Sequence, residues 1–194
     1  MRKPNLYIIA GCNGAGKTTN SFTVLPKMLD CKEFVNADSI ALGLSPFQPE
    51  NVAIAAGKIM LNRINELIGL QNDFAFETTL STRSFVKTIE KAKQNNFEVS
   101  IIFYYLDDVE LAIQRVQQRV LEGGHNIPEN VIRPRYVAGI YNLIHLYLNI
   151  GDAIVIVDNS TKTELIVAVK SINNQIEIRD KTTWTKILNQ SKNE

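Results

Sequence analysis

Short apolar runs alternate along this chain with longer segments in which apolar residues recur at helical spacing. The strand-like runs lie at residues 6–10, 33–36, 74–76, 99–106 and 153–157. Helical patterns fill the intervals, at residues 17–29, 51–70, 83–95, 110–122 and 130–149. Strands that alternate with helices are typical of a parallel sheet covered by helices. The pattern therefore predicts an α/β fold of three layers with a parallel five-stranded sheet.

The C-terminal part of the chain departs from this alternation. Residues 165–170 and 175–179 are strand-like and flank the stretch Ser171-Ile172-Asn173-Asn174, which predicts a hairpin. Residues 184–188 are expected to form a short closing helix, and Pro134 is expected to break the stretch at 130–149 early. No internal repeat or low-complexity linker divides the sequence, so residues 1–194 are expected to form a single domain.

The composition gives no support to several classes of protein. Hydrophobic residues make up 45% of the 194 residues, and 21 basic residues balance 20 acidic residues to a net charge of +1. This balance gives no electrostatic reason to expect nucleic acid or a membrane surface as a partner. The apolar runs are too short for a transmembrane helix, and the N-terminus lacks the features of a signal peptide. Cys12 and Cys31 form neither a disulfide framework nor a zinc motif, so a cytoplasmic location is predicted.

The segment that follows the first predicted strand carries the clearest chemical signal. Residues 11–18 read GCNGAGKT and match the phosphate-binding loop (P-loop) pattern G-x-x-x-x-G-K-[ST]. In such a loop Lys17 contacts the β- and γ-phosphates and the Thr18 hydroxyl binds Mg²⁺, while backbone N–H groups face the phosphates. Cys12 is expected only to fit the loop as a small side chain. We therefore predict that ATP or GTP is bound with Mg²⁺ by Gly11, Asn13, Gly14, Ala15, Gly16, Lys17, Thr18 and Thr19.

Two carboxylates follow the second and third predicted strands. Because ligands in open α/β sheets bind at the carboxyl ends of the strands, Asp38 and Glu77 are expected near the P-loop. Asp38 is a candidate base for the attacking hydroxyl, and the alternative is a cap for the stretch at 39–42. Glu77 is a candidate for holding a Mg²⁺-bound water or a substrate hydroxyl. The alternative for Glu77 is a cap for the helix that begins near Ser81.

Four arginines fall in and beside two predicted helices that a glycine-rich loop connects. They are Arg115, Arg119, Arg133 and Arg135. Residues 110–136 are a candidate lid over the nucleotide, and arginines on a lid can clamp phosphate oxygens. The alternative is a solvated helix face paired with Glu122 and Glu129. His125 in the connecting loop is expected to make a structural hydrogen bond.

These motifs together resemble the zeta toxin family of P-loop kinases, and they cover about residues 5–160 in the family's order. The matching pieces are residues 11–19 (GCNGAGKTT), Asn36-Ala37-Asp38, Ala55-Ala56-Gly57-Lys58, residues 76–81 (FETTLS), Arg119-Val120, residues 123–128 (GGHNIP) and Arg135-Tyr136. The resemblance implies phosphorylation of a small-molecule hydroxyl with ATP or GTP. In this family the best-known acceptor is the 3′-hydroxyl of the amino sugar in UDP-N-acetylglucosamine.

Site residues follow from the resemblance position by position. Asp38 resembles the base that activates the sugar hydroxyl, and Glu77 and Thr79 resemble substrate-side residues. Arg119 and either Arg133 or Arg135 resemble the lid arginines. Toxins of the family are held by an antitoxin. Because the first strand begins near residue 6, any such inhibitor is expected to be a separate protein.

The resulting hypothesis is a kinase that phosphorylates a small-molecule hydroxyl, with UDP-N-acetylglucosamine as the leading acceptor. One alternative is a kinase for another nucleotide-sugar, a drug or a metabolite. An alternative of another class is a nucleotide-binding switch that hydrolyses nucleotide slowly and acts through protein association. Acceptor-stimulated release of ADP distinguishes the switch from either kinase.

Overall fold

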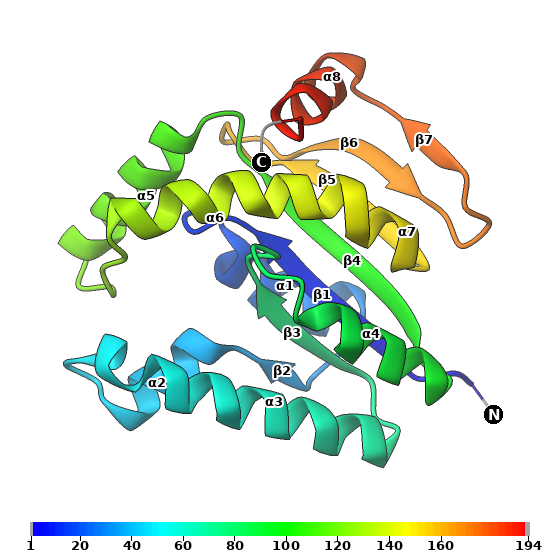
Figure 1. The fold of residues 1–194 in the computed structure, drawn as a ribbon, viewed down its shortest axis with the longest axis horizontal. Helices are drawn as coiled ribbons and strands as arrows, with labels where there is room; N and C mark the ends of the chain where they lie inside the picture. The colour runs from blue at the N-terminus through cyan, green and yellow to red at the C-terminus, as the bar shows by residue number, and fades with distance from the viewer. Residues whose placement is uncertain (1, 193–194) are drawn as a thin grey trace.

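The strands of the computed structural model, which describes residues 2–192, form one seven-stranded sheet (Figure 1). Their order across the sheet is β2-β3-β1-β4-β5-β6-β7. The strands are β1 (Asn5–Gly11), β2 (Phe34–Val35), β3 (Phe74–Thr78), β4 (Glu98–Tyr105), β5 (Ala153–Asp158), β6 (Leu165–Lys170) and β7 (Ile176–Ile178).

The predicted parallel five-stranded sheet is confirmed, because neighbouring strands from β2 to β5 all pair in parallel. At its centre, Ile8 of β1 lies beside Phe76 of β3 and Ile101 of β4. The predicted hairpin also forms, but it extends the sheet: β6 pairs antiparallel with β5, and β7 with β6. Asn174 closes the hairpin turn at φ 62°, a left-handed conformation that asparagine tolerates. The sheet is therefore mixed and has two more strands than the parallel pattern predicted.

Helices lie on both faces of the sheet, with α4 and α6 in front of it and α1 behind it in Figure 1. The helical elements are α1 (Lys17–Met28), α2 (Ala37–Leu44), η1 (Pro49–Val52), α3 (Ala53–Leu70), α4 (Phe85–Gln94), α5 (Val109–Leu121), α6 (Glu129–Asn142), η2 (Leu143–Tyr147), α7 (Leu148–Ile150) and α8 (Lys181–Gln190). The chain thus has the three layers that the pattern predicted. Among residues 2–192, no helix is long and apolar enough to cross a membrane.

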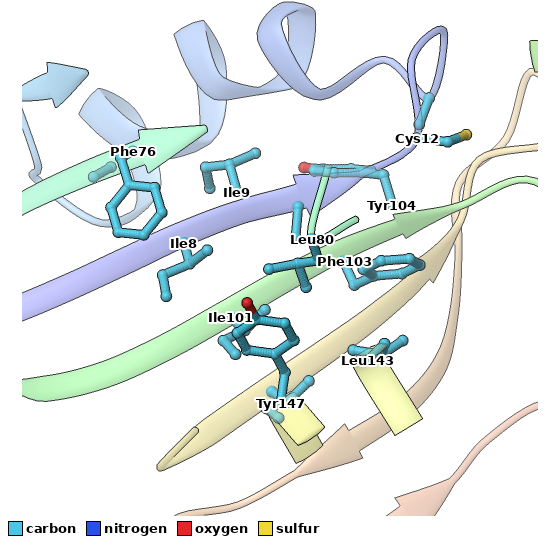
Figure 2. Packing of buried hydrophobic residues seen from close by; sticks show 14 of the residues in the cluster. Ile8, Ile9, Cys12, Phe76, Leu80, Ile101, Phe103, Tyr104, Leu143 and Tyr147 are labelled. Carbon is cyan, nitrogen blue, oxygen red and sulfur yellow. The ribbon is translucent and has the colours of Figure 1, made fainter. Parts of the chain in front are cut away.

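Buried side chains join the sheet to the helices in front of it. Figure 2 shows Ile101 and Phe103 of β4 facing Leu143 and Tyr147 of the helical layer, and all are at most 2% exposed. The Tyr147 hydroxyl also donates to the Thr82 carbonyl oxygen at 2.8 Å. Apolar burial of this extent is the main stabilising contribution to a fold. Because the tyrosine also binds the chain after β3, the core holds that segment in place.

Two predictions about helices differ from the structure. Residues 37–44 form α2, where the sequence indicated a loop with a short helical stretch, and the Asn36 side chain caps it. Pro134 lies inside α6 and does not break it, and helical structure continues to Ile150 through a π-helical turn. Buried Ile132 and Tyr136 lie on either side of Pro134 and fix α6 against the core. This packing offsets the loss of the backbone N–H at proline.

Candidate active site

The P-loop connects β1 to α1 and has the backbone conformation that its glycines permit. Gly14 and Gly16 have φ values of 78° and 84°, a left-handed region that side chains disfavour. A Cβ atom at Gly14 would also lie 2.6 Å from the Ala112 carbonyl oxygen of α5. Both positions therefore require glycine, and the loop packs directly against the N-terminal part of α5.

Lys17 is the first residue of α1 and is 6% exposed. Its Nζ donates to the Cys12 carbonyl oxygen at 2.8 Å, across the P-loop. The same Nζ lies 3.6 Å from Glu77 Oε1. A buried ammonium is stable only with such partners, and the flexible lysine stem can carry the charge to a phosphate placed in the loop.

Glu77, near the end of β3, is the central acid of the site. Its Oε2 accepts hydrogen bonds from Thr18 Oγ1 at 2.7 Å and from Asn36 Nδ2 at 2.8 Å. Its Oε1 faces Lys17, and the side chain is 10% exposed. Glu77 does not cap the next helix, because it lies in the strand and points toward the P-loop. Hydroxyl and carboxylate oxygens are ligands that Mg²⁺ takes, so Thr18 and Glu77 fit this ion.

Asp38 lies in the first turn of α2 with an exposed side chain. The cap of this helix is Asn36, whose Oδ1 accepts from the Ser39 backbone N–H at 3.0 Å. The alternative that Asp38 serves as the cap is therefore not what the structure shows. Asp38 instead lines the cavity described next.

A cavity of about 360 Å³ connects these groups at the carboxyl ends of β1, β2 and β3. The P-loop contributes Asn13 and Lys17 to its wall, β3 and the following loop contribute residues such as Glu77 and Thr79, and α3 contributes Gly57, Met60 and Leu61. Thr79 and Ser81 both line the cavity, and their hydroxyl oxygens lie 2.8 Å apart. The predicted phosphate, base and acceptor residues thus surround one space.

The arginines of the predicted lid do not share one environment. Arg135 lines the cavity, and its Nη1 lies 3.5 Å from Asn13 Oδ1 of the P-loop. Arg133 is turned away and pairs with Glu110 and Glu129 on the surface. Arg119 Nη2 donates to the His125 carbonyl oxygen at 2.8 Å, and Arg119 is not among the residues that line this cavity.

The loop between α5 and α6 contacts both Arg119 and η1. Within residues 2–192, Arg119 Nε is a buried polar atom without a hydrogen-bond partner. His125 Nδ1 lies 3.8 Å from Glu50 Oε2 of η1, so the loop between α5 and α6 approaches the wall that α2, η1 and α3 form. Arg115 Nη2 donates instead to the Ser160 carbonyl oxygen at 3.2 Å.

The remaining P-loop residues differ in exposure. Gly11, Asn13 and Ala15 are buried, whereas Gly14, Gly16 and Thr18 are partly exposed. Thr19 is exposed on the first turn of α1. Asn159, which follows β5, donates from Nδ2 to the Ala15 carbonyl oxygen at 2.9 Å and supports the loop from behind. The sequence did not predict a role for Asn159, because a single asparagine after a strand belongs to no motif.

Cys12 is buried in the P-loop, and burial raises the pKa of its thiol to about 11. Thiol chemistry requires the thiolate, so this agrees with the expectation that Cys12 serves only as a small side chain.

At pH 8 about one Cys12 thiol in a thousand would be ionised. We expect the folded protein to react slowly with a disulfide reagent at this pH and the unfolded protein to react rapidly at both cysteines. Rapid reaction of Cys12 in the folded protein would contradict this description.

The fold and the P-loop define the class of this protein as a P-loop protein of the kinase type. The family model of the zeta toxins matches residues 45–184, which is more than half of the chain. The chain therefore belongs to the zeta toxin family, as its motifs predicted. The match begins at residue 45 and therefore includes neither the P-loop nor Asp38. The P-loop is recognised from its sequence pattern, and Asp38 is a candidate because of its position on the cavity wall.

Several proteins are similar to this chain over most of its length. A protein of Haemophilus influenzae described as uncharacterized is 33% identical over 128 residues, which are 65% of this chain and 88% of that one. The AvrRxo1-ORF1:-ORF2 structure with ATP has a TM-score of 0.79 at 17% identity, over 95% of this chain. The chain spans only 63% of that protein's length.

Two further solved structures share the fold. One, from the PezAT chromosomal toxin–antitoxin system of Streptococcus pneumoniae, has a TM-score of 0.65 at 18% identity and covers 100% of this chain and 89% of its own. A gluconokinase from Sinorhizobium meliloti has a TM-score of 0.53 at 13% identity, over 100% of this chain and 97% of its own. At such identities the likeness concerns the fold.

Proposed function

We propose that this protein transfers the γ-phosphate of ATP or GTP, with Mg²⁺, to a hydroxyl of a small molecule. UDP-N-acetylglucosamine is the leading acceptor, on the basis of the family's motif set. One observation carries the proposal: Lys17, Glu77, Asp38 and Arg135 surround a single cavity of about 360 Å³. A phosphate cradle, a metal-side acid, a candidate base and a cation are the parts that phosphoryl transfer needs.

The phosphate side of the proposed reaction rests on the P-loop and the start of α1. Backbone N–H groups of the loop and the N-terminus of α1 would bind the β- and γ-phosphates. Lys17 would leave the Cys12 carbonyl and contact the γ-phosphate. Thr18 and Glu77 would hold Mg²⁺, which when bound neutralises the charge on the phosphate oxygens.

The acceptor side rests on α2 and the segment after β3. Asp38 would accept the proton of the attacking hydroxyl as the bond to phosphorus forms. Its exposed carboxylate on the cavity wall supports this role, because a substrate can reach it. Glu77 and Thr79 would contact the acceptor from the carboxyl end of β3, where both line the same cavity.

The second lid arginine is proposed to be Arg135, because it lines the cavity whereas Arg133 pairs with surface carboxylates. We expect Arg135→Ala to lower kcat by about 10²-fold or more, since an arginine near the transferred phosphate acts on transition-state charge. Arg133→Ala is the matched control and should leave kcat within about threefold, because it loses only exposed ion pairs. Steady-state kinetics on both variants, with Arg119→Ala beside them, measures the three contributions. Equal losses at positions 133 and 135 would contradict the assignment.

Residues 1–194 are proposed to act as one kinase domain in which residues 110–136 form a lid. A separate antitoxin protein is the proposed macromolecular partner. Family membership supports it, together with the toxin–antitoxin system to which the structurally similar S. pneumoniae protein belongs.

Release of ADP is the experiment that tests the class of function. A kinase should release ADP from Mg²⁺-ATP faster when the acceptor is present, in proportion to phosphorylated acceptor. A nucleotide-binding switch should release ADP slowly, at a rate that no small-molecule acceptor changes. We expect UDP-N-acetylglucosamine to stimulate release at least tenfold, and no stimulation across a panel of hydroxyl compounds would contradict the proposal.

A further inference from the structure

Asn36 occupies a buried position between the two acids of the site. The residue is 6% exposed and follows β2 directly. Its Nδ2 donates to Glu77 Oε2 at 2.8 Å, and its Oδ1 accepts from the Ser39 backbone N–H at 3.0 Å. Both ends of one planar amide are therefore used, one on β3 and the other on the first turn of α2.

We propose that Asn36 is a positioning residue that fixes the Glu77 carboxylate relative to the turn of α2 that carries Asp38. The inference rests on the proposed function, in which Glu77 is the metal-side acid and Asp38 is the base. An amide is rigid and planar, so it sets the spacing between its two partners. Catalytic groups that must stay in place to within a fraction of an ångström need hydrogen bonds from the residues around them.

Helix capping alone does not explain an asparagine at this position. Serine, aspartate and asparagine cap helices about equally well. Asparagine carries its acceptor and its donor on separate atoms of one planar amide, whereas serine has only one oxygen for both, on a shorter side chain, and ionised aspartate has no donor. Aspartate at position 36 would place a second carboxylate against Glu77, and serine would cap the helix without an N–H group that reaches Glu77.

The hydrogen bonds of Glu77 show what the amide contributes. Its Oε2 accepts from both Asn36 and Thr18, which leaves Oε1 directed toward Lys17. Within residues 2–192, Glu77 Oε2 accepts one hydrogen bond from Asn36 and one from Thr18. Without the Asn36 donor, only the hydrogen bond from Thr18 would remain. The nearly buried carboxylate could then rotate away from the orientation that the P-loop hydroxyl and ammonium share.

The test compares Asn36→Ser with Asn36→Ala, because serine restores the cap and alanine does not. We expect both variants to lower kcat by about 10–100-fold and to raise the KM for Mg²⁺-ATP by no more than about tenfold. Only Asn36→Ala should also lower the melting temperature clearly. Asp180→Ala removes the cap of α8, away from the site, and controls for the loss of a helix cap. It should lower the melting temperature and leave kcat unchanged.

A double-mutant cycle with Glu77→Gln shows whether Asn36 acts through that acid. In the Glu77→Gln background, Asn36→Ser should change kcat by less than about twofold. A wild-type kcat in Asn36→Ser would overturn the inference, because helix capping would then explain the role of Asn36 completely. Additive losses in the cycle would overturn it as well.

Binding of a fluorescent ATP analogue separates this inference from the proposed function. We expect the wild type to bind the analogue more tightly with Mg²⁺ than with EDTA, and Asn36→Ser to reduce this gain about tenfold without changing the affinity in EDTA. An unchanged gain in Asn36→Ser, when Glu77→Gln loses it, would refute the role of Asn36 alone. Absence of any gain in the wild type would refute the proposed metal site and this inference together.

Discussion

Lys17→Ala is expected to abolish phosphoryl transfer and leave the fold in place. Lys17 is the buried cation of the P-loop, and the transition state of transfer carries its charge on the phosphate oxygens. Removal of this cation should lower the rate by roughly 10³-fold or more. Steady-state transfer assays measure the loss, and a thermal melt of the same sample checks the fold.

Lys27→Ala is the matched control for this variant. It removes an exposed lysine from the last turn of the same helix and should change neither the rate nor the melting temperature appreciably. Lys17→Ala activity within about tenfold of the wild type would contradict the assignment of residues 11–18 as a catalytic P-loop. The prediction therefore tests the phosphate side of the site independently of the acceptor.

Asp38→Asn is expected to retain nucleotide binding and lose transfer. Asparagine has nearly the same shape as aspartate but cannot take the hydroxyl proton, and loss of a general base costs about 10²–10⁴ in rate. We expect the substitution to change the free energy of unfolding little, because Asn36 caps α2 and Asp38 is exposed. Transfer kinetics and a nucleotide titration on one preparation separate the two effects.

The control for Asp38 is Asp30→Asn, the same change at an exposed acid outside the cavity wall. It should leave transfer unchanged. A fall of only a few fold for Asp38→Asn would show that Asp38 does not act as the base. The proton would then have to leave the acceptor by another route, and the kinase class would stand.

The parts of this protein that the sequence predicted are those with strong local patterns. The apolar runs predicted the parallel strands, because strands that are buried on both faces of a sheet have nearly continuous apolar sequences. The P-loop was predictable because four fixed residue types in eight positions have a single common structural meaning. Glu77 was predicted from its place at a strand end, and the structure places it against Thr18 and Lys17.

Features that depend on distant contacts were not predictable in this way. The helix at residues 37–44 is short, and its cap makes a second bond to Glu77, 41 residues further along the chain. Pro134 indicated a break that tertiary packing of Ile132 and Tyr136 overrides. The asparagine before α2 is a common helix cap, but this signal alone does not predict how far a helix extends.

The arginines also show the difference between what local sequence patterns predict and what depends on distant contacts. Their spacing indicated a lid but left Arg133 and Arg135 equivalent. Only the position of α6 in the fold turns Arg135 toward Asn13 and Arg133 toward Glu110. The structure also holds Arg119 against the His125 carbonyl, a contact that its spacing on α5 does not predict. The action of Arg119 on phosphate stays a prediction, which the kinetics of Arg119→Ala beside Arg133→Ala and Arg135→Ala test.

Mass spectrometry of the acceptor tests the central claim most directly. The protein is incubated with Mg²⁺-ATP and a panel of nucleotide-sugars, and the products are compared with those of Lys17→Ala. We predict that UDP-N-acetylglucosamine gains the mass of one phosphoryl group, located on the amino sugar by fragmentation, and that Lys17→Ala gives no such product. Phosphorylation of another member of the panel would replace the acceptor and keep the kinase. No phosphorylated product from any hydroxyl compound, while ATP is bound, would contradict the account.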